Sequence, residues 1–208
     1  IGIFDVSGHG ITAGLMTILS KGIISQHFIS GLEQNISLTK VLEEINETYI
    51  KEKVNVDNYI TGLLFKFSDF DSDDICHVQL VNAGHPYPIL YHTKNQKISE
   101  QKYENQNEQY GIIGIEGLDV SFPTVNFDVS INDVIVCFTD GITEATNLNN
   151  EDFTKDRIIE IVKNNAELSS REIGQKIMAK LESFTEGTTI DDDITLIVLK
   201  RNNSRNFI

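Results

Sequence analysis

The chain has 208 residues, of which 40% are hydrophobic and 23% charged, and this fits one soluble globular domain with a sizeable core. Its formal net charge of −14 argues against a nucleic-acid partner, because phosphate backbones repel an acidic surface. No apolar run approaches the roughly 20 residues that span a bilayer, so no transmembrane segment is predicted.

The first part of the chain predicts a strand followed by two helices. Residues 1–6 are short and apolar and end at a Gly-rich turn. Apolar residues then recur at helical spacing over 11–28 and 38–51. Ser37 and Thr39 are both suited to cap the second helix.

Strands and a second helix pair are predicted for the remainder. The expected strands are 59–67, 75–83, 88–92, 120–127, 133–139 and 194–200, and the expected helices are 155–164 and 169–184. Strands grouped around paired helices, rather than alternating with them one for one, favour an α+β class. The polar stretch 93–109 lacks periodicity and is predicted to be an exposed insertion, and 201–208 a polar tail.

The two cysteines and the first residue suggest the setting of the chain. Cys76 and Cys137 lie in apolar strand-like runs, which is typical of small buried hydrophobic residues. A reducing, cytoplasmic setting is therefore favoured. The sequence begins at Ile1, without an initiator Met or the charged start of a signal peptide. We expect a piece of a longer protein, and that parent could be membrane-anchored.

Three acidic positions share one local context. Asp5 and Asp140 each end an apolar strand immediately before a Gly-containing turn, and Asp192 and Asp193 precede the last strand. A carboxylate at a strand end lies on a rigid element at the rim of a sheet, and Mg²⁺ and Mn²⁺ prefer such oxygen ligands. Each residue alone could simply start a turn or cap a helix. Together they predict a cation-binding cleft.

Four motifs contain these aspartates or lie between them. They are Asp5-Val6-Ser7-Gly8-His9-Gly10, Asn82-Ala83-Gly84-His85-Pro86, Thr139-Asp140-Gly141-Ile142-Thr143-Glu144-Ala145 and Asp192-Asp193-Ile194-Thr195. Their order resembles that of PPM (type 2C) protein phosphatases, most closely the SpoIIE/RsbU-like bacterial branch. The resemblance covers nearly the whole chain. It implies one phosphatase domain over residues 1–200, with an αββα sandwich of two mainly antiparallel sheets flanked by helix pairs.

The same resemblance implies a metal site. Asp5 resembles the carboxylate that bridges two metals, and the carbonyl of Val6 the backbone oxygen beside it. Asp140 and Asp192 resemble the remaining ligands, while Asp193 stands where many relatives have Asn. Asp5, Asp140 and Asp192 are thus implied to be catalytic, holding two Mn²⁺ or Mg²⁺ ions that activate a water. The implied reaction is the hydrolysis of phosphoserine or phosphothreonine in a partner protein.

Other residues of the motifs have two interpretations. His9 and His85 are candidate general acids, and the alternative for each is that it shapes a loop. Thr143 and Glu144 follow Asp140 and are expected to support it.

The resemblance also implies partners, and it leaves alternatives open. The substrate in this branch is often an anti-sigma-factor antagonist, a sensor domain is expected upstream, and a homodimer is left open. Relatives carry a further acidic residue on a strand ahead of the one at Ile1, so we expect an N-terminally truncated domain. Whether such a fragment is active stays open. The alternatives are an inactive PPM-fold module that binds a partner and, from Asp140-Gly141, a haloacid dehalogenase-type phosphohydrolase.

Regulation is the last hypothesis from the sequence. The helices over 11–28 and 38–51 follow directly from the turn that carries Asp5, so a small rotation of a stiff helix would move that turn. We hypothesise that this helix pair is a switch element. The alternative is that both helices only cover a sheet.

Overall fold

The chain divides into two compact units with separate cores. The computed structural model describes residues 1–8, 10–53, 57–102, 111–117, 120–189 and 192–201. Unit 1 comprises Ile1–Ser68, Val78–His85 and Tyr103–Phe127, and unit 2 comprises Asp69–His77, Pro86–Lys102 and Asp128–Ile208. Two of the boundaries between the units fall within the strands Ile75–Ala83 and Thr124–Ser130.

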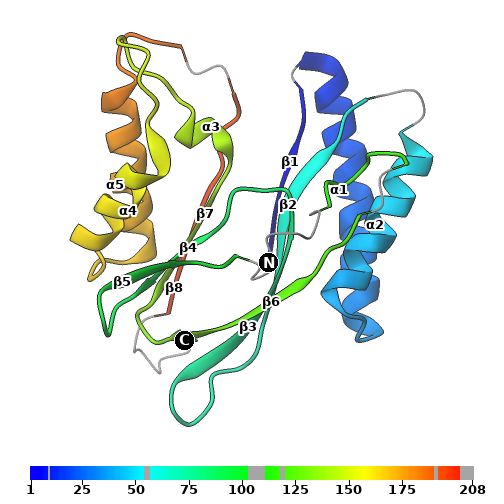
Figure 1. Ribbon diagram of the computed structural model, residues 1–208, viewed down its shortest axis with the longest axis horizontal. Helices are drawn as coiled ribbons and strands as arrows, with labels where there is room; N and C mark the ends of the chain where they lie inside the picture. The colour runs from blue at the N-terminus through cyan, green and yellow to red at the C-terminus, as the bar shows by residue number, and fades with distance from the viewer. Residues whose placement is uncertain (9, 54–56, 103–110, 118–119, 190–191, 202–208) are drawn as a thin grey trace. The chain divides into compact units, whose positions relative to one another are not determined.

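Unit 1 is built on an antiparallel sheet with the strand order β1-β2-β3-β6 (Figure 1). Its elements are β1 (Gly2–Val6), α1 (Gly10–Glu33), α2 (Leu38–Glu52), β2 (Ile60–Phe67), β3 (Ile75–Ala83) and β6 (Thr124–Ser130). The pairing of β1 with β2 places Asp5 opposite Thr61, and the pairing of β2 with β3 places Leu63 opposite Asn82. The register therefore fixes which residues lie beside Asp5.

The core of unit 1 lies between α2, α1 and the sheet. Leu42, Ile45 and Tyr49 form one fully buried face of α2 because they recur at helical spacing. Gly31 lets α1 approach α2 closely, since a Cβ at this position would lie 2.5 Å from a methyl carbon of Val41. The side chain of Ser37 caps α2 by accepting from the Lys40 N–H (3.3 Å). Packing against the sheet thus sets the position of α2.

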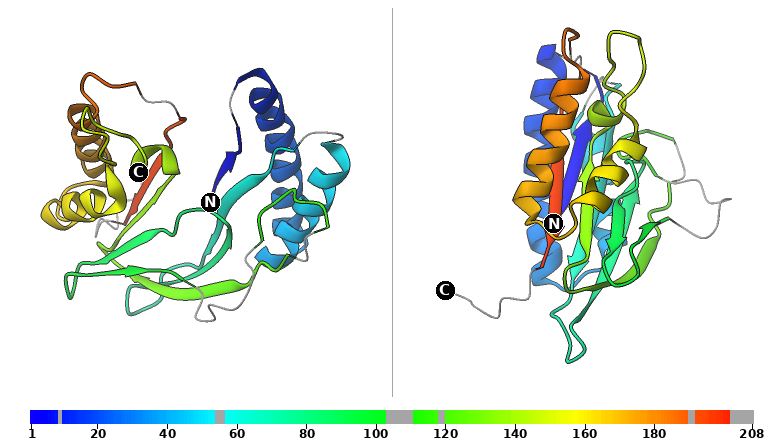
Figure 2. Two further views of the ribbon diagram at one scale, coloured as in Figure 1. Left: turned by 45° about the horizontal axis from the view of Figure 1, so that its top comes forward. Right: turned by 90° about the vertical axis from the view of Figure 1, so that its left-hand side faces the viewer.

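Unit 2 contains the second antiparallel sheet, with the strand order β5-β4-β7-β8. Its elements are β4 (Ile89–His92), β5 (Lys97–Glu100), β7 (Val134–Phe138), α3 (Asp140–Thr143), α4 (Thr154–Asn164), α5 (Ser170–Phe184) and β8 (Leu196–Lys200). Helices α4 and α5 lie together beside β7 and β8 (Figure 2). The five residues of β7 are all buried, so this strand forms the centre of the unit.

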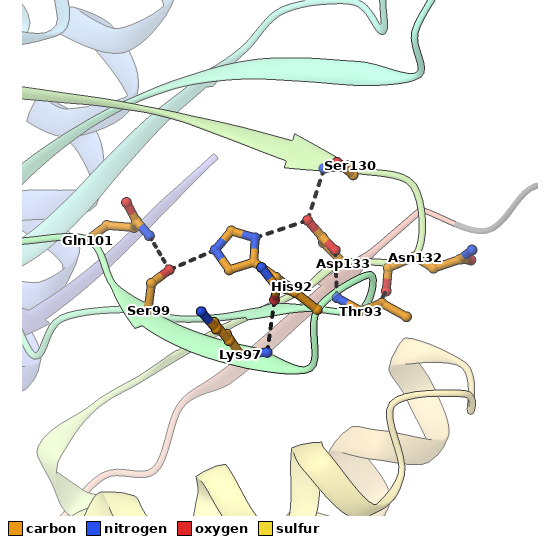
Figure 3. Close-up of polar contacts among 9 residues, drawn as sticks. His92, Thr93, Lys97, Ser99, Gln101, Ser130, Asn132 and Asp133 are labelled. Carbon is orange, nitrogen blue, oxygen red and sulfur yellow. Dashed lines mark hydrogen bonds and ion pairs between the residues drawn. The ribbon is translucent and has the colours of Figure 1, made fainter.

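A buried carboxylate fixes the start of β7. Asp133, only 3% exposed, accepts hydrogen bonds from the backbone N–H groups of Thr93 (2.8 Å) and Ser130 (3.0 Å). His92 lies 3.4 Å from the same carboxylate and contacts Ser99 on β5 at 2.9 Å (Figure 3). Because both carboxylate oxygens accept from backbone groups, this row of Asp, His and Ser is an anchor of the β6–β7 turn.

The structure confirms the α+β class and the two antiparallel sheets, each with a pair of helices. It adds a strand that the sequence did not predict, because β5 forms within the stretch 93–109, expected to be an exposed insertion, and Ile98 packs against the core. Backbone pairing with β4, which a polar sequence does not reveal, creates this strand. Residues 103–109 and 202–208 lie outside the described residues.

Two expectations about composition can be compared with the structure. Both cysteines are free and buried, and burial raises the pKa of the Cys137 thiol to about 12. A buried thiol with a raised pKa is unreactive, so Cys137 acts as a small hydrophobic residue. Within the described ranges, none of the helices is both long and apolar enough to cross a membrane.

Candidate metal centre

The end of β7 is tied to the segment that precedes β8. The Thr139 N–H donates to the Thr195 carbonyl (3.1 Å), and the Thr195 N–H donates to the Thr139 hydroxyl (2.9 Å). That hydroxyl in turn donates to the Asp193 carbonyl (3.1 Å). Thr139 is 2% exposed, whereas Asp193 and Thr195 are exposed, so these bonds are partly shielded from water. They hold residues 139–141, here called the β7 turn, against residues 192–195.

A glycine makes this contact close. A Cβ on Gly141 would lie 2.5 Å from the Asp193 carbonyl oxygen and 3.4 Å from the Cβ of Asp192. Any side chain at this position would force the two segments apart. The structure therefore brings Asp192 beside the turn that carries Asp140, although the two residues are far apart in the sequence.

The short helix α3 follows directly from Asp140. The Asp140 carbonyl accepts from the Glu144 N–H (2.9 Å) and from the Thr143 hydroxyl (3.2 Å). Thr143 and Glu144 thus contact the backbone of Asp140, and the Glu144 contact comes from the main chain alone. Both contacts fix the direction in which the chain leaves β7.

Ser7 holds the turn that follows β1. Its N–H donates to the Tyr59 carbonyl (2.9 Å), and its hydroxyl accepts from the Tyr59 N–H (2.9 Å). Its carbonyl accepts from the side-chain amide of Asn58. Gly8 and Gly10 have φ angles of +91° and +81°, a conformation that favours glycine. Residues 5–8, here called the β1 turn, are thus held by the pairing of Asp5 and Val6 with β2 and, after the strand ends, by residues 58 and 59.

The Asn82-to-His85 motif closes a loop in the same unit. The Asn82 side chain accepts from the His85 N–H (2.8 Å) and donates to the His85 carbonyl (2.9 Å), as expected for a loop-shaping motif. His85 is 4% exposed, and its Nδ1 lies 2.9 Å from the hydroxyl of Thr61. Thr61 is the cross-strand partner of Asp5, and opposite residues of an antiparallel pair share one face. The fold therefore brings His85 to the face of the sheet that carries Asp5.

The profile of the family described as Stage II sporulation protein E (SpoIIE) matches residues 1–202. The chain belongs to the SpoIIE family. This confirms the branch expected from the four motifs. No curated protein matches the sequence.

Solved structures share the fold of this SpoIIE-family chain. The SiaA-PP2C domain of Pseudomonas aeruginosa superposes with a TM-score of 0.75 at 16% identity, over 97% of this chain and 75% of that one. A Bacillus subtilis SpoIIE structure, comprising the PP2C phosphatase domain and a fragment of the regulatory domain, gives 0.66 at 18%, over 95% and 52%.

A third structure was solved with metal. The catalytic domain of the serine/threonine protein phosphatase PstP in complex with two manganese ions gives a TM-score of 0.55 at 11% identity, over 95% of this chain and 85% of that one. At such identities the likeness shows the fold alone. The SpoIIE-family chain spans about half of the B. subtilis structure.

The predicted site residues of this SpoIIE-family chain fall into two groups. Asp140 and Asp192 lie together in unit 2, while Asp5 and Val6 lie in unit 1, so the convergence of all four stays a prediction. Among the described residues, no group of three or more His, Cys, Asp or Glu side chains could hold a metal ion. Each group by itself is therefore an incomplete site. His9 lies outside the described residues.

The donors themselves suit a hard cation. All four are oxygens, which Mg²⁺ and Mn²⁺ prefer, and the contact at Gly141 places Asp192 beside the turn of Asp140 without an intervening side chain. The sequence analysis missed one supporting residue in each unit. Thr139 belongs to a quoted motif but had no role, and Asn58 carries no sequence signal beyond that of a polar residue before a strand.

Proposed function

We propose that this chain hydrolyses phosphoserine or phosphothreonine in a partner protein, using two Mn²⁺ or Mg²⁺ ions. Asp5, the Val6 carbonyl, Asp140 and Asp192 would hold the ions. The contact of Gly141 with residues 192 and 193 carries the proposal, because it brings Asp192 beside the turn that carries Asp140. When bound, the ions would lower the pKa of a water and offset charge on the phosphoryl oxygens.

The chain's own contribution is to place the oxygens in advance. The β7 turn is held by hydrogen bonds of the buried Thr139, so Asp140 needs little reorganisation when a cation arrives. On the β1 side, the N–H of Ser7 faces Tyr59. Because the Val6–Ser7 peptide is planar and trans, the Val6 carbonyl points to the opposite side. The Mn²⁺-bound PstP structure supports the choice of two ions.

The direct test is phosphate release from a phosphoserine peptide. We expect release that requires Mn²⁺ or Mg²⁺, stops with EDTA, and is lost in Asp5→Asn and in Asp192→Asn. Release that persists in EDTA would contradict the proposal. Saturable Mn²⁺ binding without any release, even from phosphorylated partner proteins, would instead identify an inactive partner-binding module of the same fold.

The partner proposals rest on family resemblance. We propose a phosphorylated anti-sigma-factor antagonist as substrate, a sensor domain elsewhere in the parent protein, and a cytoplasmic position for this domain. An anti-sigma-factor antagonist phosphorylated on serine should release phosphate faster than an unrelated phosphoserine protein. Equal rates for the two would argue against this class of substrate.

A homodimer is supported by one face of α1. Its exposed large apolar residues are Ile11, Leu15, Ile18, Ile29 and Leu32. Ile11, Ile18 and Leu32 differ by multiples of seven, as do Leu15 and Ile29, which is the spacing of a helix–helix seam. Lys21 is the only charged residue between Gly10 and Leu32, so this face lacks the charge by which an acidic chain repels its copy. A second copy of the same helix is therefore the proposed occupant.

The oligomeric state tests this proposal. Sedimentation should show a dimer for the wild type and a monomer for Ile18→Glu. The matched control is Glu47→Ala on α2, which should stay dimeric. A monomeric wild type at high micromolar concentration would contradict the proposal.

A further inference from the structure

Asn58 joins two parts of unit 1 that the proposed mechanism leaves unconnected. Its side-chain amide donates to the carbonyl of Ser7 in the β1 turn. Its own carbonyl accepts from the ammonium group of Lys53, the C-cap residue of α2 (2.8 Å). A single residue therefore contacts both the turn that carries Asp5 and the end of a helix.

The surroundings of Asn58 are closely packed. A Cβ on Gly114 would lie 3.5 Å from the Asn58 carbonyl oxygen and 2.6 Å from the ring of Tyr49. The Gly114 N–H donates to the side chain of Asn46 in α2 (2.7 Å), and both groups are buried. The last turns of α2 thus hold the Asn58 carbonyl through Lys53, and the segment at Gly114, which α2 holds through Asn46, lies beside it.

The other contact of Asn58 acts on the proposed metal ligands. Among the described residues Ser7 makes three hydrogen bonds, and the one to its carbonyl comes from the side chain of Asn58. The Ser7 N–H shares a rigid peptide plane with the Val6 carbonyl. Fixing Ser7 on both sides therefore fixes the direction of the Val6 carbonyl and the path of the chain just after Asp5.

We infer that Asn58 is a positioning residue that sets the β1 turn for cation binding and links this turn to the end of α2. The inference rests on the proposed function, because it concerns the oxygens of Asp5 and Val6. It goes beyond that proposal by assigning a role to a residue outside the four motifs. It also gives a physical route by which a movement of α2 would reach the metal ligands.

Two variants separate hydrogen bonding from size and charge. Asn58→Ala removes the amide, and Asn58→Asp keeps the size but replaces the N–H donor with an acceptor facing the Ser7 carbonyl. By charge alone, Asn58→Asp would strengthen cation binding, so weaker binding in this variant points to geometry. Asn126→Ala is the control, since Asn126 is exposed in the same unit and accepts one bond from Gln79.

Mn²⁺ binding to the 208-residue chain is measured by titration calorimetry without substrate. Both Asn58 variants should bind Mn²⁺ about three- to tenfold more weakly than the wild type, which is the range expected for one hydrogen bond. The Asn126→Ala control should bind as the wild type does. Unchanged Mn²⁺ affinity in both Asn58 variants would overturn the inference.

Amide exchange of the metal-free protein gives a second readout. The Ser7 amide should exchange faster in both Asn58 variants, whereas the amides of the β7 strand should not change. Equal exchange at Ser7 in the wild type and the variants would overturn the inference. If the wild type binds no Mn²⁺, the proposed function fails, and exchange at Ser7 alone then decides whether Asn58 positions the turn.

Discussion

The β1 turn and the β7 turn each carry a proposed metal ligand, but they are held in different ways. The β7 turn follows a fully buried strand, and its bonds to residues 193–195 come from the backbone N–H and the hydroxyl of the buried Thr139. The β1 turn follows a strand in which only Ile3 is buried, and one of its bonds comes from the side chain of Asn58. The β7 turn is thus anchored in the core, and the β1 turn depends on contacts near the surface.

This difference suggests a division of roles. A turn whose anchoring residue is buried, as Thr139 is, opens only with its core, whereas a turn held by the half-exposed Asn58 and the exposed Tyr59 opens locally at a lower cost. We therefore expect the β7 turn to provide the constant half of the centre. The β1 turn is then the half that a regulatory movement of α2 would adjust, which refines the hypothesis that α1 and α2 form a switch.

The largest effect is expected from the β7 turn itself. Asp140→Asn removes one ligand charge with little change in volume, so the fold should persist. Phosphate release with saturating Mn²⁺ should fall more than about 100-fold, because even residues that only support a ligand are worth 10- to 100-fold. Asp156→Asn, which changes an exposed carboxylate on α4, is the control and should keep full activity. Unchanged release in Asp140→Asn would refute its role.

The next effect tests whether the close contact at Gly141 is needed. In Gly141→Ala the new methyl would lie 2.5 Å from the Asp193 carbonyl, so the segments must separate, at about 1–3 kcal/mol of unfolding free energy. The Mn²⁺ affinity of Gly141→Ala should fall together with its stability. In Gly174→Ala the new methyl meets Val198 at an ordinary 3.7 Å, and this helix substitution should stabilise by about 0.5–1 kcal/mol. Similar melting temperatures for both variants would argue against a constrained β7 turn.

A smaller effect is expected from Thr139→Val. This nearly isosteric change leaves the Thr195 N–H and the Asp193 carbonyl without their partner at a part-buried position, which costs about 0.5–1.5 kcal/mol. Urea unfolding should show the loss. Thr17→Val removes only a side-chain bond to a helix carbonyl and should change stability by less than about 0.5 kcal/mol. If the two variants lose the same stability, the β7 turn is not held as described.

The sequence predicted the elements whose signal is local. The buried residues of helix α2 and strand β7 could be predicted because apolar residues recur there at helical or strand spacing. The position of the aspartates at strand ends could be predicted from the apolar run beside each of them. Helix α3 was missed because four residues carry no periodicity. Strand β5 was missed because its polar residues gain their structure from pairing with β4. The bond of Asn58 to Ser7 joins residues 51 positions apart, and no local pattern records it.

The smallest expected effect tests the link between α2 and the β1 turn. Lys53→Met keeps the apolar stem but removes the ammonium group that donates to the Asn58 carbonyl and lies over the Tyr49 ring. Loss of a positive charge alone would strengthen Mn²⁺ binding, so any weakening reports a displaced turn.

We expect a decrease in Mn²⁺ affinity of about twofold for Lys53→Met. This is less than for Asn58→Ala, because the Asn58 carbonyl is part of the backbone and keeps its covalent connections when the Lys53 bond is lost. Lys66→Met is the control, since it loses the same charge from an exposed contact with Asn35 in the same unit. Its Mn²⁺ affinity should stay constant or rise slightly. If both lysine variants bind Mn²⁺ equally well, the end of α2 does not act on the turn. The β1 turn would then be independent of α2, and the division of roles between the two turns would be wrong.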